Sequence, residues 1–180
     1  TELGAMGDAP ATPPPTTISE IHGRHYTTPH LGREVKNITG VVTAVGPKGF
    51  WIQEPVHNDK DPTAPAGIHI RASQPSVQVG DLVSVDGKIS MFQPNPRELS
   101  RTQMDDVTYR VIGKSSLPKT VLIGKNGLLP PRTVFEGRTA PGDVEDPNTP
   151  FLPDRHALAF YKALEDRRVR EHQGLDQLRC

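Results

Sequence analysis

Apolar and polar residues alternate along several short segments of the first two thirds of the chain, which is the pattern of strands that bury one face. These segments are rich in β-branched residues and are separated by turn chemistry such as Gly46-Pro47-Lys48-Gly49. Two glycines inside them, Gly40 and Gly87, predict bulges or bends of the kind that a small barrel needs to close. The predicted strands cover residues 35–45, 50–54, 67–71, 82–91 and 97–104.

Five short strands of this kind predict an all-β fold, a five-stranded and partly open OB-type barrel, with a small sandwich as the alternative. Extra extended segments follow at 108–112 and 119–123, and a short C-terminal helix is predicted near 155–166. In that helix, Leu158, Tyr161 and Leu164 share a face and Asp154 is placed to cap the start. The chain then divides into a tag remnant with a proline-rich linker, a barrel domain, and an irregular remainder that holds the helix. The predicted boundaries are 1–17, 18–129 and 130–180.

The alternation also sorts each strand into two faces. The predicted interior is formed by Phe50, Ile52, Ile68, Ile70, Val83, Val85 and Ile89. The opposite positions form an outer surface, which carries Trp51, Gln53, His69, Arg71 and Lys88.

That outer surface is the candidate functional site, because OB barrels bind oligonucleotides across their second and third strands. An exposed aromatic ring offers a stacking platform for a base, and an arginine stacks or pairs with phosphate. The opposing interpretation has Trp51 packed under the 55–66 loop or under C-terminal segments, with the cations simply solvated. The candidate nucleic-acid-binding residues are Lys48, Trp51, Gln53, His69, Arg71, Lys88, Arg97 and Arg101.

Composition and charge limit how strong such binding could be. The chain has 21 Lys+Arg and 21 Asp+Glu, whereas strong nucleic-acid binders usually carry a basic excess. We therefore expect weak binding of single- or double-stranded nucleic acid, carried by local clustering. The neutral charge equally favours a structural module that docks a protein domain without touching nucleic acid. An oligosaccharide is a lesser alternative.

No pattern in the sequence predicts catalysis, a cofactor or a metal site. The one cysteine, Cys180, forms neither an internal disulfide nor a CxxC site, and the spacing of His22, His25 and His30 matches no specific metal motif. Hydrolase and phosphate-loop motifs are absent from the sequence. A free-standing metal-dependent hydrolase is therefore disfavoured. A membrane span is also disfavoured, because the sequence has no long apolar run. The first residues look like a cloning remnant, so a removed signal peptide would leave no trace.

Four stretches in a fixed order carry a resemblance to a known family. They are Ile18-Ser19-Glu20-Ile21-His22-Gly23, Gly40-Val41-Val42-Thr43-Ala44-Val45, Gly49-Phe50-Trp51-Ile52-Gln53-Glu54 and Val79-Gly80-Asp81-Leu82-Val83-Ser84-Val85-Asp86-Gly87. Residues 18–112 thereby resemble the OB-type domain that precedes the catalytic domain in bacterial and fungal extracellular nucleases of the endonuclease/exonuclease/phosphatase superfamily. Residues 158–169 are similar to the family's lead-in to that domain, although Asp166-Arg167 stand where Gly-Met is expected.

The resemblance implies a secreted parent nuclease that uses Mg²⁺ or Ca²⁺ in a catalytic domain absent from this chain, so none of its metal ligands is carried over. For this chain it implies a non-catalytic accessory module that positions DNA or RNA by stacking and backbone contacts. The alternative is a structural or protein-interaction module that docks the catalytic domain.

Overall fold

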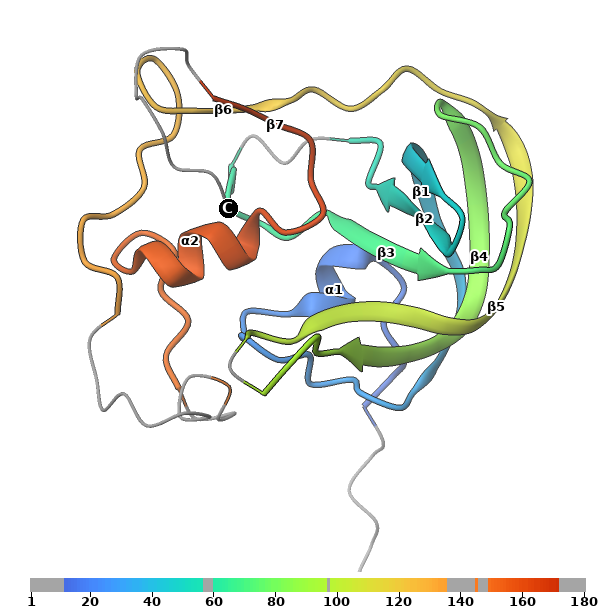
Figure 1. The fold of residues 1–180 in the computed structure, drawn as a ribbon, viewed down its shortest axis with the longest axis horizontal. Coiled ribbons are helices and arrows are strands. Elements are labelled where there is room, and N and C mark those ends of the chain that lie inside the picture. Colours follow the sequence, from blue (N-terminus) through green and yellow to red (C-terminus); the bar gives the residue numbers. More distant parts are fainter. Residues whose placement is uncertain (1–11, 57–59, 97, 136–144, 146–148, 172–180) are drawn as a thin grey trace, which may run out of the picture.

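Strands dominate the structure, a computed structural model that describes residues 12–56, 60–96, 98–135, 145 and 149–171. Five of them close into a barrel in the order β1-β2-β3-β5-β4 (Figure 1). Neighbouring strands are antiparallel except for β3 and β5, which run parallel. The predicted all-β, five-stranded barrel is confirmed at this level, but it is closed rather than partly open. The strands are β1 (Glu34–Gly46), β2 (Gly49–Gln53), β3 (Gly67–Arg71), β4 (Asp81–Phe92) and β5 (Arg101–Lys114).

The fifth strand differs from its prediction at both ends. It begins at Arg101 rather than residue 97, and it continues through the segment 108–112 that the sequence separated from it. A bulge is the reason: Asp106 has a φ of 50°, and the pairing with β4 shifts register opposite it, between Asp86 and Lys88. The bulge breaks the alternation, so one bent strand looks like two in the sequence.

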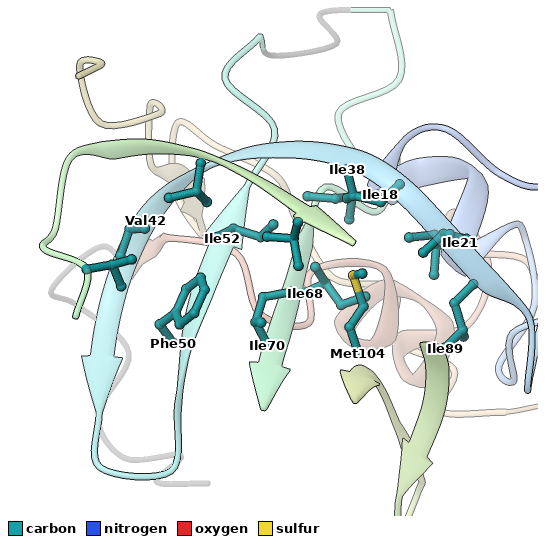
Figure 2. Packing of buried hydrophobic residues seen from close by; sticks show 14 residues of the cluster. Ile18, Ile21, Ile38, Val42, Phe50, Ile52, Ile68, Ile70, Ile89 and Met104 are labelled. Carbon is teal, nitrogen blue, oxygen red and sulfur yellow. The ribbon is translucent and has the colours of Figure 1, made fainter. Parts of the chain in front are cut away.

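The predicted apolar set lies in the barrel interior, part of which Figure 2 shows. Phe50, Ile52, Ile68 and Ile70 from β2 and β3 are fully buried, together with Val83, Val85, Ile89 and Met104 from β4 and β5. Gly40 does not sit at a bulge. A Cβ there would stand 2.8 Å from the Cβ of Ile52, so this glycine lets β1 cross closely over the core.

A helix that the sequence did not predict closes one end of this core. It is α1 (Ile18–His22), which buries Ile18 and Ile21 against the barrel. The Thr17 side chain caps it by accepting a hydrogen bond from the amide of Glu20, and Gly23 ends it at a φ of 60°. Five residues are too few to show a helical period.

The C-terminal part forms a smaller unit beside the barrel (Figure 1). It contains β6 (Val121–Ile123), α2 (Ala157–Ala163) and β7 (Val169–Glu171), with β6 and β7 paired in parallel. Residues of β6 and of α2 with its C-cap pack into a small apolar cluster, made of Val121, Ile123, Leu128, Phe160 and Leu164.

The predicted C-terminal helix is present, but its cap and its buried face were predicted incorrectly. His156, not Asp154, is the N-cap, because the amides of Arg155 and His156 turn back to the Leu152 carbonyl first. Ala159, Phe160 and Ala163 are buried, whereas Tyr161 is half exposed. Within the described ranges, no helix is long and apolar enough to cross a bilayer.

Candidate functional site

The strand register lines up polar side chains across the outside of the barrel. Trp51 on β2 pairs with His69 on β3, His69 pairs with Gln103 on β5, and Gln103 pairs with Ser90 on β4. Adjacent strands are about 4.8 Å apart, so this row spans roughly 14 Å. We call the surface formed by this row and by the outward residues Arg71, Arg101, Asp105 and Lys88 the polar face.

The centre of the polar face is a pair of stacked rings. The ring centroids of Trp51 and His69 lie 4.6 Å apart at a tilt of 46°. Gly49 makes room for the pair, since a Cβ on it would stand 2.6 Å from Nε2 of His69. The glycine predicted as part of a turn therefore also positions a ring of the site.

A chain of hydrogen bonds holds His69 from the other side. Its Nδ1 lies 3.5 Å from Oε1 of Gln103, and Nε2 of Gln103 donates to Asp105 at 2.9 Å. The hydroxyl of Ser90 donates to the same carboxylate at 2.7 Å, and Arg71 lies 3.9 Å from it. The three residues Gln103, Asp105 and Ser90 were not predicted as part of the site. Alternation was the signal that could have revealed them: Gln103 and Asp105 alternate with Thr102 and Met104 on β5, and Ser90 stands between two apolar residues of β4.

Burial lowers the pKa of His69, because a partly buried imidazolium is poorly solvated. The hydrogen bond to Gln103 and the carboxylates of Asp166 and Asp105 oppose this shift, and the charge of Arg101 adds to it. The shift favours the neutral form of the ring. In that form the ring offers the face a flat aromatic surface rather than a positive charge.

Positive charge comes instead from the arginines at either side of the ring pair. The side chain of Arg71 is 68% exposed. Arg101 is exposed too, with its guanidinium 5.6 Å from the centre of the Phe92 ring. Both side chains reach the surface, so an anion in solution can approach their guanidinium groups.

The two predicted lysines, Lys48 and Lys88, lie at the edges of the face, and both are exposed. Lys48 is in the β1–β2 turn, beside the Trp51 end of the row. Lys88 pairs in register with Asp105 on one side and with Glu34 on the other, so its charge is flanked by acids. Arg97 lies outside the described residues.

Residues 164–168, which we call the strap, cross the β2–β3 end of the polar face on their way from α2 to β7. The amide of Arg168 donates to Oε1 of Gln53 at 3.0 Å. The guanidinium of Arg167 donates to the carbonyls of Pro62 and Ala64 at 3.0 and 3.1 Å. The expectation that Gln53 belongs to the open surface is therefore wrong: it is only 2% exposed, because the strap covers it.

Asp166 is the strap residue that meets the ring pair. Its carboxyl accepts a hydrogen bond from the Trp51 indole, and Arg101 and His69 both act to lower its pKa. Burial nevertheless raises the pKa of this carboxyl, and Oδ2 is buried without a hydrogen bond in the described part of the chain. Its backbone has a φ of 58°, a conformation that glycine, the residue the resemblance expects there, adopts without steric strain.

The strap leaves Trp51 partly open. The indole is half-buried, and it lines an open hollow of about 290 Å³ together with Thr43, Ala44 and the strap residues 166–168. The two interpretations of Trp51 thus each hold in part: a C-terminal segment packs on one edge, and another edge reaches the surface.

Among the residues that the structure describes, no group of three or more His, Cys, Asp or Glu side chains is placed to hold a metal ion, and we assign none. Comparison of the chain with protein-family models, with curated proteins and with solved structures found no match.

Proposed function

We propose that the barrel is an OB fold that serves as a non-catalytic nucleic-acid-binding module, with the polar face as its binding surface. One observation carries the proposal: the stacked Trp51 and His69 lie between the exposed cations Arg71 and Arg101 on the outside of β2, β3 and β5. Flat rings with flanking cations are the means by which single strands are bound without reading their sequence.

The chemistry of the face sets the expected strength and selectivity. Each base stacked on an aromatic ring contributes about 1–3 kcal/mol, and every base has a face to stack. The carboxylate of Asp105 already engages Ser90, Gln103 and Arg71, so part of the positive charge is compensated. We expect weak, salt-sensitive binding with little sequence preference, for RNA and DNA alike.

Anisotropy of a fluorescein-labelled oligothymidylate, titrated with the protein at low salt, tests this proposal. Trp51→Ala and Arg101→Ala should each weaken binding about tenfold, the equivalent of about 1.4 kcal/mol. Arg110→Ala is the matched control, since Arg110 is an exposed arginine toward the other end of the same strand as Arg101. Equal losses in Arg101→Ala and Arg110→Ala would mean that only the net charge of the protein matters. Failure of the wild-type protein to bind, even at the lowest salt concentration, would refute the proposal.

A second function, a protein-docking module, is favoured by the strap. The β2–β3 end of the face already binds polypeptide, through Gln53 and through a close contact at Gly67. On this view the barrel positions a neighbouring domain, such as the nuclease domain that the resemblance implies, and nucleic acid is not involved. A full-length chain that binds no oligonucleotide even with the strap loosened would favour this function.

The wider setting is part of the same proposal. The resemblance places such a module beside a metal-dependent catalytic domain in an extracellular nuclease, where weak binding would raise the local concentration of substrate. Mg²⁺ or Ca²⁺ would then serve the catalytic domain, and no residue of this chain is given a catalytic role.

A further inference from the structure

The strap and the polar face have complementary chemistry. The face presents an indole N–H, an imidazole and a guanidinium from three adjacent strands, namely Trp51, His69 and Arg101. The strap carries the Asp166 carboxyl to this face, where it accepts a hydrogen bond from the Trp51 indole and where the nearby Arg101 and His69 both act to lower its pKa. These are also the groups that would hold a phosphate oxygen of a nucleic acid, because N–H donors and guanidinium bind both kinds of oxyanion.

The carboxyl is an imperfect ligand for this position. Among the residues that the structure describes, none donates a hydrogen bond to its buried Oδ2, and burial raises its pKa, so the donors of the face offset only part of the cost of desolvating the charged form. A phosphate would bring a permanent negative charge and further oxygens to the same donors. The nucleic acid would also bring a base for the ring pair.

The rest of the strap is attached away from these donors. Arg167 bonds to the loop carbonyls of Pro62 and Ala64, and the Arg168 guanidinium bonds to the Pro118 carbonyl at 2.5 Å. The carbonyl of Arg168 accepts from Val121 at the start of β6. Release of the strap would therefore uncover Gln53 and the Trp51 edge without breaking any hydrogen bond of the barrel ladder.

We propose that the strap is a built-in competitor for the polar face, with the Asp166 carboxyl standing where Trp51, His69 and Arg101 would hold a phosphate of a single-stranded nucleic acid. This inference rests on the proposed function. It requires that strap release and nucleic-acid binding favour each other, because the strap and the nucleic acid cannot occupy the face at the same time.

Two variants loosen the strap by different means. Asp166→Asn removes the charge while keeping a residue that tolerates a positive φ. Arg167→Ala removes the anchor to the loop without touching the ring pair. It also deletes a positive charge, so an account based on charge alone expects weaker binding, whereas strap release predicts tighter binding. Asp154→Asn and Arg110→Ala are the controls, because each makes a like charge change at an exposed residue off the strap.

The experiment is the oligothymidylate titration, run with the full chain beside the emission spectrum of the free protein. Trp51 is the only tryptophan, so a red shift of its emission reports strap release without any ligand. We expect Asp166→Asn and Arg167→Ala to shift the emission to the red and to tighten binding about fivefold or more, within the usual range of coupling between sites. The two controls should change neither by that amount.

The other outcomes separate the two proposals. If the wild type binds the oligonucleotide and the red-shifted variants bind it equally or more weakly, the strap inference is overturned and the proposed function stays intact. Red-shifted variants that bind no oligonucleotide, like the wild type, would end both and favour the docking function. Emission that moves in neither variant would show that the strap is a fixed part of the fold, which also overturns the inference.

Discussion

A Cβ on Gly67 would stand 2.2 Å from the carbonyl oxygen of Asp166, so the strap lies directly on the backbone of β3. The contact joins residues that are far apart in the chain, and it exists only because position 67 has no side chain. Any larger residue must push the strap backbone away or displace β3, and β3 is held by pairing on both sides.

Gly67→Ala is therefore predicted to open the strap. We expect a loss of stability of about 1–3 kcal/mol, the usual cost of overpacking, and faster tryptic cleavage after Arg167 and Arg168. The measurement is limited proteolysis with mass spectrometry. Gly113→Ala is the matched control, because a Cβ there meets nothing within 4 Å. Equal cleavage rates in the two variants would contradict the predicted displacement.

A second prediction concerns the barrel core. Ile70 is fully buried in the main cluster, whereas Ile112 on β5 is 48% exposed. Ile70→Ala should cost about 2–5 kcal/mol of unfolding free energy, because it removes buried methyl groups and leaves a cavity. Ile112→Ala makes the same chemical change and should cost much less. Urea denaturation measures both, and similar losses would mean that the interior is not where the structure places it.

The sequence was sufficient for the features that depend on local alternation. The inward set Phe50, Ile52, Ile68 and Ile70 follows from a period of two within short strands, and all four are buried. The placement of Trp51 and His69 on one outer face follows from the same period, whereas their pairing depends on the register between β2 and β3. The course of β5 could not be predicted from this period, because the bulge at Asp106, a residue with a positive φ, reverses the alternation beyond it.

The strap could not be predicted, since it depends on contacts between distant residues. Alternation correctly points Gln53 outward, but whether an outward residue stays open depends on what crosses it, here Arg168. The helix α1 was missed because its five residues are too few to show a helical period. The face of α2 was misassigned because Ala159 and Ala163 pack closely on their neighbours, while the larger Tyr161 extends into water.

A third prediction concerns acid stability. His22 is buried, and its Nε2 lies 2.7 Å from the Gly67 carbonyl. Burial lowers its pKa to about 4, and the charge of Lys162 contributes to this, while the hydrogen bond to Gly67 opposes it. Between about pH 6.5 and 4 the unfolded chain binds a proton at this site that the folded chain does not. This residue should therefore lower the unfolding free energy by about 3 kcal/mol as the pH falls through that window.

The raised pKa values of Glu165 and Asp166 act in the opposite direction, so the wild-type profile alone would not isolate His22. The difference between wild type and His22→Gln does so. Urea denaturation at pH 7 and at pH 4.5 should show a smaller acid-induced loss in the variant. Identical losses would place the buried proton acceptor elsewhere.

The last prediction tests how Gly49 positions the ring pair. A Cβ on Gly49 would stand 2.2 Å from the Ile70 carbonyl and 2.6 Å from Nε2 of His69, so Gly49→Ala must move either the strand or the imidazole. Moving the imidazole separates it from Trp51. We expect a changed Trp51 emission and a loss of stability of about 1–3 kcal/mol.

Gly46→Ala is the control for this prediction. It lies in the same turn, and there a Cβ would meet the indole at an ordinary 3.7 Å, so it should alter both quantities far less. If oligothymidylate binding also falls in Gly49→Ala and not in Gly46→Ala, the stacked geometry matters for binding and not merely the presence of two rings. Unchanged emission in Gly49→Ala would mean that the ring of His69 does not rest on this glycine.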